Sequence, residues 1–141
     1  MTGPIIVGVD GSVTAGKAAE AARDLAVALR APLHVVCAFE GNRTEVVGSG
    51  SDTWIHSDAD TALGIAKNAA AKLAAPGLTT TYAAGRGRPA DALIAEAELH
   101  SARMIVVGNR RMQGLGRVLG SVANAVAHAA PCDVYIVKTV D

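Results

Sequence analysis

The sequence predicts an α/β protein in which helices cover both faces of a mainly parallel sheet. Short apolar runs alternate with amphipathic helical segments along the whole chain, and this alternation implies right-handed crossovers between parallel strands. Half of the residues are hydrophobic but only 3% are aromatic, so the core must consist of Ala, Val, Leu and Ile. A length of 141 residues fits one domain. We expect a single domain over residues 1–141, with no internal repeat.

The amino-terminal part predicts a strand, a helix and a second strand. The continuous apolar runs Ile5–Val9 and Leu33–Phe39 are typical of strands buried on both faces. Between them, the apolar residues of Ala15–Leu29 fall on one helical stripe, with charged residues turned away.

The middle of the chain predicts a loop, a capped helix and a third strand. Gly41–Ser57 is polar and contains glycine, and we expect a long loop there that includes Trp54. Small apolar residues from Ala59 to Leu73 repeat at helical spacing, and Ser57 or Asp58 is placed to cap that helix. Thr79–Ala84 then alternates as a strand does.

The last third adds two helices and two strands. Pro89 suits the first position of a helix that runs to about His100, because the missing N–H of proline costs nothing there. Met104–Val107 is the fourth strand, Ser121–Ala129 a fourth helix and Val134–Val137 the fifth strand. We therefore expect a flavodoxin-like three-layer sandwich with about four helices and strand order 3-2-1-4-5.

Charge and composition argue against several classes of function. Thirteen basic residues balance thirteen acidic ones, so no long-range field favours nucleic acid or an anionic membrane. No apolar run approaches the roughly 20 residues of a membrane span, and Asp10 comes too early for a signal peptide. Cys37 and Cys132 lie in predicted strands without metal or redox spacing, and we interpret them as buried apolar residues. A cytoplasmic location is expected.

An anion site is predicted where the fourth strand ends. Gly108–Gly120 is rich in glycine and arginine and leads into a helix that begins at Ser121. Glycines allow close approach to a phosphate, and the N–H groups and dipole of the helix attract negative charge. Open α/β sheets bind ligands at the carboxyl ends of their strands, where the chain changes direction. Asp10–Ser12, after the first strand, should therefore face the same cleft.

These segments resemble the universal stress proteins. In that family the fourth strand is followed by a glycine, two residues, a second glycine, nine residues, and then Gly-Ser or Gly-Thr. Gly108, Gly120 and Ser121 match, as do Val9-Asp-Gly-Ser12 and the Ala-Pro-Cys-x-Val segment at 130–134. Arg111 stands in place of the second glycine, and eight residues separate it from Gly120. The resemblance extends over the whole chain.

The resemblance implies an ATP site at the cleft. Residues matching Asp10 contact ribose and a water bound to the metal, those matching Cys37 and Ala38 meet adenine, and the Gly-Ser step holds phosphate. Together with loop residues between the glycines, the candidate nucleotide-binding positions are Val9, Asp10, Cys37, Ala38, Gly108, Asn109, Arg110, Arg111, Gly120, Ser121 and Val122. The implied cofactor is ATP with Mg²⁺, and the implied assembly is a homodimer through Val134–Val140.

Several candidate residues admit more than one interpretation. Arg110 and Arg111 either grip a phosphate or fill the space that a glycine would leave for one. Asp10 is also a common turn residue after a strand. Gly8, near the end of the first strand, suits close approach by a ligand or by another backbone. Trp54 either stacks on a base or a partner, or anchors its loop.

Dedicated enzyme chemistry finds little support in the sequence. Gly11–Ala18 approaches a Walker A loop, but the helical stripe places Gly16 and Lys17 within the first helix. The four histidines show no metal-pair spacing, and we expect each to be structural. No general base or nucleophile is recognisable. We expect a stress-response switch or sensor with little or no turnover. The alternative is a dimeric interaction module without ATP, or a cyclic AMP binder.

Overall fold

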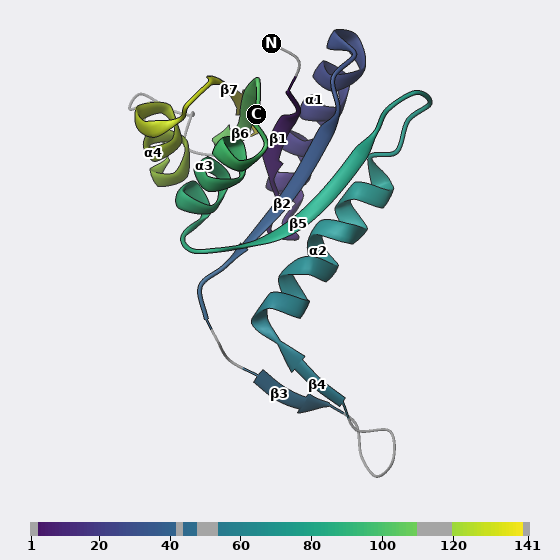
Figure 1. The fold of residues 1–141 in the computed structure, drawn as a ribbon, viewed down its shortest axis with the longest axis vertical. Helices are drawn as coiled ribbons and strands as arrows, with labels where there is room; N and C mark the ends of the chain where they lie inside the picture. Colours follow the sequence, from purple (N-terminus) through teal and green to yellow (C-terminus); the bar gives the residue numbers. More distant parts are fainter. Residues whose placement is uncertain (1–2, 42–43, 48–53, 110–119, 140–141) are drawn as a thin grey trace.

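A computed structural model of the chain describes residues 3–41, 44–47, 54–109 and 120–139 (Figure 1). Its main sheet has five strands in the order β5-β2-β1-β6-β7, and all neighbouring pairs are parallel. The strands are β1 Ile5–Gly8, β2 Leu33–Phe39, β5 Thr80–Arg86, β6 Met104–Asn109 and β7 Asp133–Lys138. The helices are α1 Val13–Leu29, α2 Asp58–Lys72, α3 Pro89–Leu99 and α4 Ser121–Ala129. The predicted fold and strand order are confirmed.

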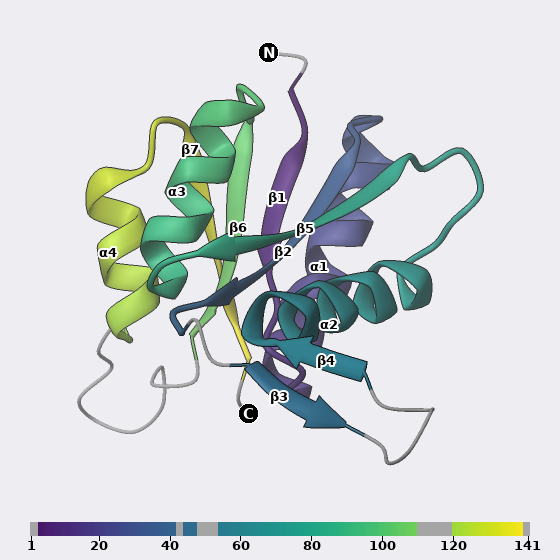
Figure 2. The same ribbon diagram turned by 60° about the horizontal axis from the view of Figure 1, so that its bottom comes forward.

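Each face of the sheet carries its own pair of helices (Figures 1 and 2). Because side chains alternate along a strand, Ile5 and Val7 pack on the face covered by α1 and α2, and Ile6 packs under α3 and α4. The helices present mostly alanine to the sheet, which allows close packing with few aromatic residues. The predicted apolar stripe of α1 is wrong at its last residue, because Leu29 is 40% exposed.

The predicted loop at Gly41–Ser57 is a hairpin of two strands. β3 Thr44–Val47 and β4 Trp54–Ser57 pair antiparallel, with Thr44 opposite Ser57, and β4 leads directly into α2 (Figure 2). Both strands contain β-branched or aromatic residues, which favour extended backbone, but polar residues and glycines between them obscured this signal. The side chain of Trp54 lies outside the described residues, so its predicted role stays open.

Ser57 caps α2 through a reciprocal pair of hydrogen bonds. The amide of Asp60 donates to Ser57 Oγ at 3.1 Å, and the amide of Ser57 donates to Asp60 Oδ2 at 3.3 Å. Of the two caps considered, Ser57 is therefore the correct one. These bonds satisfy two of the N–H groups that a helix start leaves without intrahelical partners.

We expect Ser57→Ala to lower the free energy of unfolding by about 1 kcal/mol, because it removes the capping oxygen. Urea denaturation measures the effect as a lower midpoint at unchanged slope. Ser57→Asp keeps an oxygen at the cap and should remain near the wild type. An equal loss in both variants would show that the hydroxyl does not act as a cap.

Three smaller expectations concern Cys132, the segment around Gly16, and membrane spans. Cys132 precedes β7 and is only half-buried, so its expected place inside a buried strand is wrong. Gly16 and Lys17 lie within α1, and Lys17 is exposed, so this segment does not form a phosphate-binding loop before the helix. Among the described helices, none has the length and apolar character needed to cross a membrane.

Candidate functional site

A cavity of about 310 Å³ lies at the carboxyl ends of β1, β2 and β6. β1 has β2 on one side and β6 on the other, so this is the point at which the strand order reverses. The cavity walls come from the turn after β1, the ends of β2 and β6, and the first turns of α1, α3 and α4. The two segments that the sequence placed in one cleft, around Asp10 and Gly120, both line it.

The turn after β1 presents Asp10 at the cavity and also starts α1. The amide of Ser12 donates to Asp10 Oδ1 at 2.9 Å, and Ser12 Oγ accepts from the amide of Ala15 at 3.1 Å. Gly11 adopts a φ of 86°, which favours glycine. Asp10 is therefore a turn residue and an exposed cavity residue together, so the two interpretations of its role are compatible.

The first turn of α4 supplies N–H groups to the opposite wall. The first intrahelical bond runs from the amide of Asn124 to the carbonyl of Gly120 at 2.9 Å. The amides of Ser121, Val122 and Ala123 precede it, and all three residues line the cavity. Helix geometry leaves such amides without intrahelical acceptors, and the helix dipole adds positive potential. This wall suits a phosphate group.

Asn109 positions the start of α4. Its side chain is almost fully buried, and Oδ1 accepts a hydrogen bond from the amide of Gly120 at 2.9 Å. A Cβ on Gly120 would lie 3.2 Å from that same oxygen. The last residue of β6 thus anchors the helix start directly, although ten residues separate them in the chain. Asn109 holds the wall of the cavity, in addition to lining it.

The glycines at the strand ends serve packing within the protein. A Cβ on Gly8 would lie 3.2 Å from both methyl carbons of Leu93 on α3. A Cβ on Gly108 would lie 2.8 Å from Thr139 Cγ2 and 3.3 Å from Ala18 Cβ. A helix side chain makes a close approach at Gly8, and Gly8 also lines the cavity, so contact with a ligand there stays a prediction.

The end of β2 contributes Ala38 but not Cys37. Cys37 is buried among the residues beneath α1 and α2 and does not line the cavity, because successive strand residues point to opposite faces. Burial raises the pKa of the Cys37 thiol, and the negative charge of Asp10 raises it further. Cys37 is therefore a protonated, packed side chain at neutral pH, so any contact with a ligand would come from its backbone.

The structure brings most of the predicted positions together. The predicted residues that line the cavity are Val9, Asp10, Ala38, Gly108, Asn109, Gly120, Ser121 and Val122. Arg110 and Arg111 lie outside the described residues. Gly8 and Ser12 also line the cavity. Further cavity residues outside the predicted set are Thr14, Ala15, Val36, Pro89, Leu93, Val107 and Ala123. The signal for Pro89 was its place at a helix start after a strand, which puts it at the same edge of the sheet.

The absence of metal-pair spacing among the histidines in the sequence did not reveal a cluster that contains two of them. His34 and His100 lie together with Glu96, at the other end of the sheet from the cavity. His34 lies far from Glu96 and His100 in the sequence, so no sequence motif contains all three residues. The spacing of Glu96 and His100, four residues apart at the end of a helix, was the one visible signal.

Comparison with known families agrees with the cavity geometry. The family model described as "Universal stress protein family" matches residues 1–138. The universal stress protein YxiE of Bacillus subtilis (strain 168) is 30% identical over 151 residues, which cover 98% of this chain and 100% of that protein.

Solved structures of similar fold include two with bound adenine nucleotides. A universal stress protein in complex with cAMP has a TM-score of 0.74 at 29% identity, covering 98% of both chains. The universal stress protein from Archaeoglobus fulgidus in complex with dAMP has a TM-score of 0.71 at 26% identity, covering 96% of this chain and 97% of that one. Both ligands are adenine nucleotides with a single phosphate.

Proposed function

The chain belongs to the universal stress protein family, and from this premise we propose that it binds an adenine nucleotide in the cavity at the carboxyl ends of β1, β2 and β6. One observation supports the proposal most strongly. The Asp10 turn and the amides of the first turn of α4 line the same cavity. One side suits a sugar hydroxyl and the other a phosphate, which is the pairing that a nucleotide requires.

The cavity offers a place for each part of the ligand. Val9, Val36, Ala38 and Leu93 supply apolar surface for the adenine ring. The Asp10 carboxylate accepts hydrogen bonds, as ribose recognition requires, and the amides of Ser121 and Val122 donate to phosphate oxygens. Two relatives of similar fold carry adenine nucleotides, cAMP and dAMP.

The finer proposal is ATP with Mg²⁺. Asp10 is the only acidic residue among the described residues that line the cavity. Mg²⁺ is commonly held by one carboxylate, waters and substrate phosphates, so Asp10 acting through water fits this ion. We propose that Arg110 and Arg111 also contact the longer phosphate chain of ATP. Cyclic AMP is the second candidate, favoured by the cAMP complex of a relative 29% identical to this chain.

We propose a switch or sensor in the cytoplasm with little or no turnover. Catalysis of phosphoryl transfer requires positioned bases and electrophiles. Among the described cavity residues, Asp10 is the only acidic or basic side chain, and its carboxylate already orders the turn after β1. The residues that line the cavity therefore support nucleotide binding more strongly than catalysis. The alternative role, a dimeric interaction module that binds no ATP, would leave the cavity without a ligand.

We also propose a homodimer through the last strand, Val134–Val140. Among the described strands, β7 pairs with β6 alone and lies at one edge of the sheet, so its outer edge suits pairing with a second copy about a twofold axis. Tyr135 on this strand is 46% exposed. Sedimentation analysis of the full chain tests the proposal, and a monomer at all concentrations would contradict it.

Thermal unfolding with ligands tests the nucleotide proposal. We expect the midpoint to rise with increasing AMP, ATP or cyclic AMP, because a ligand that binds only the native state adds about 1.4 kcal/mol of stability per tenfold excess over Kd. Adenosine and inorganic phosphate serve as half-ligand controls and should act weakly. A greater rise for ATP with Mg²⁺ supports the finer proposal, and a rise for cyclic AMP alone supports the second candidate. No rise with any adenine nucleotide would contradict the function.

A further inference from the structure

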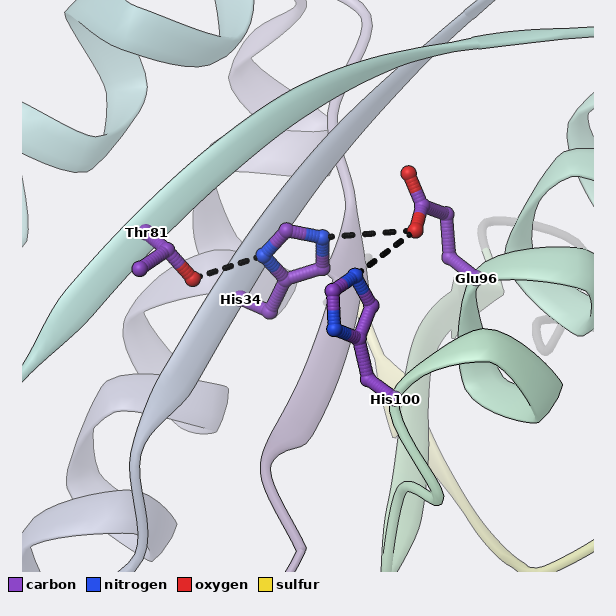
Figure 3. Close-up of polar contacts among 4 residues, drawn as sticks. All are labelled: His34, Thr81, Glu96 and His100. Atoms are coloured by element: carbon purple, nitrogen blue, oxygen red, sulfur yellow. Dashed lines mark hydrogen bonds and ion pairs between the residues drawn. The ribbon is translucent and has the colours of Figure 1, made fainter.

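Three nitrogen and oxygen donors converge near the amino ends of the strands, remote from the nucleotide cavity. They are His34 on β2, Glu96 on α3 and His100 at the carboxyl end of α3 (Figure 3). Glu96 Oε2 lies 3.6 Å from His34 Nε2 and 3.1 Å from His100 Nε2. The three donor atoms all lie within 4.8 Å of one another. None of these residues lines the nucleotide cavity.

The fold holds all three side chains in place. His34 faces α3 because it alternates with Leu33 and Val35, which pack on the other face of the sheet. Glu96 and His100 are four residues apart and so share one side of the helix. The helix ends at Leu99 with His100 as its capping residue, and a tight turn follows in which the amide of Ala102 donates to the carbonyl of Ala97 at 2.9 Å.

The two ring nitrogens of His34 face different partners. Nδ1 lies 2.7 Å from Thr81 Oγ1, a contact drawn in Figure 3, and which of the two atoms donates depends on the tautomer of the ring. In the tautomer with the proton on Nδ1, that nitrogen donates to the hydroxyl and the lone pair of Nε2 faces the Glu96 carboxylate. Both Nε2 of His34 and Oε2 of Glu96 are buried, and the contacts of Glu96 Oε2 with the two rings are ion-pair contacts without hydrogen-bond geometry. Two such acceptors repel one another unless a cation lies between them.

Burial reinforces this arrangement. It lowers the pKa of His34, and the nearby His100 lowers it further, against the opposing influence of Glu96. A neutral imidazole is the form of histidine that coordinates metals. Its side chain is 6% exposed and that of Glu96 13%, whereas that of His100 is 41% exposed. An ion can thus enter from the side of His100.

We propose that His34 Nε2, Glu96 Oε2 and His100 Nε2 bind a divalent transition-metal ion of the Zn²⁺ type. Bonds of about 2.0–2.2 Å in a tetrahedral site place the ligand atoms roughly 3.3–3.6 Å apart. The separations of 3.6 Å and 3.1 Å from Glu96 Oε2 are already close to that range. Two imidazoles and one carboxylate form a donor set that suits zinc and leaves a fourth position open to water or a further ligand.

Thr81 acts as a positioning residue for this site. Metal-bound histidines usually donate their second ring N–H to a neighbouring acceptor, which fixes the ring orientation. The contact between His34 Nδ1 and Thr81 Oγ1 has this form. Because the ligands join β2 to the end of α3, the ion would connect the sheet to a helix whose first turn lines the nucleotide cavity.

Titration of the full-length, tag-free protein with Co²⁺ and Zn²⁺ after chelator treatment tests the site. We expect one equivalent of Co²⁺ to produce the intense visible absorption of a tetrahedral site, and Zn²⁺ to displace it and raise the unfolding temperature. His100→Ala should weaken Co²⁺ binding by more than about 100-fold, because even changes in outer-shell partners cost 10–100-fold. Thr81→Val should weaken it by about 10–100-fold.

The controls separate this site from adventitious binding. His128→Ala removes an exposed histidine of α4 and should leave the titration unchanged. His100 is partly exposed at a helix end, so its variant should fold even if changes at His34 do not. Absence of stoichiometric binding to the wild type, or equal binding by His100→Ala, would overturn the proposal. Unfolding temperatures without metal show that each variant is folded.

Discussion

Replacing Ser121 with aspartate is expected to weaken AMP binding by on the order of 100-fold, while the protein stays at least as stable. Ser121 is the first residue of α4, is exposed, and lines the cavity where the phosphate is proposed to lie. A carboxylate there repels the phosphate, because like charges placed together cost several kcal/mol. The same carboxylate stabilises the helix dipole by about 0.3–1 kcal/mol. Affinity and stability therefore change in opposite directions.

Calorimetric titration with AMP and thermal unfolding without ligand measure the two effects of Ser121→Asp. Ser121→Asn is the matched control, since asparagine has nearly the same size as aspartate but carries no charge. This variant should retain most of the affinity for AMP. A Ser121→Asp variant that binds AMP as the wild type does would place the phosphate elsewhere. A loss of both affinity and stability would point to a local folding defect.

Truncation of Ile105 to alanine is expected to lower the free energy of unfolding by about 2–5 kcal/mol. Ile105 lies on β6 between β1 and β7, is fully buried, and packs beneath α3 and α4. Removing three carbons there loses hydrophobic transfer free energy and leaves a cavity that the sheet backbone cannot close. The unfolding midpoint should fall by roughly 10 °C for a domain of this size.

Leu99→Ala is the matched control for Ile105→Ala. It also removes three carbons, but Leu99 is 74% exposed at the end of α3, so its loss should change stability by no more than about 0.5 kcal/mol. Urea denaturation of both variants gives the comparison. Similar losses at both positions would contradict the burial of Ile105, as would a small loss at Ile105.

The fold was predictable because the strand and helix patterns agree with the tertiary structure. The apolar runs at Ile5 and Leu33 became parallel central strands, and Pro89 and Ser121 became the first residues of helices. The hairpin of β3 and β4 was missed because strand propensity in short segments is weak beside polar residues and glycine. Pairing between such segments depends on contacts that a single sequence does not display.

The two main segments of the candidate site could be predicted from the topology of the sheet, whereas the tertiary contacts that complete the cavity could not. Parallel strands end at one edge of the sheet, so Asp10 and Gly120 were expected together. The part played by Leu93 depends on how α3 packs against Gly8, which the sequence does not encode as a local pattern. Asn109 was predicted to contact the ligand, and its buried side chain also fixes the start of α4. His34 and Glu96 meet only through tertiary packing.

Amide chemical shifts of the isotope-labelled protein, followed during titration with AMP, test the nucleotide site most directly. We expect the amides of Val9–Ser12, Ala38 and Ser121–Ala123 to shift together with one dissociation constant, because all belong to segments that line one cavity. The chemical shifts of the amides around His34 and His100 should stay unchanged. Shifts confined to one of the two facing segments, shifts at the other end of the sheet, or no saturable shifts at all would contradict the account.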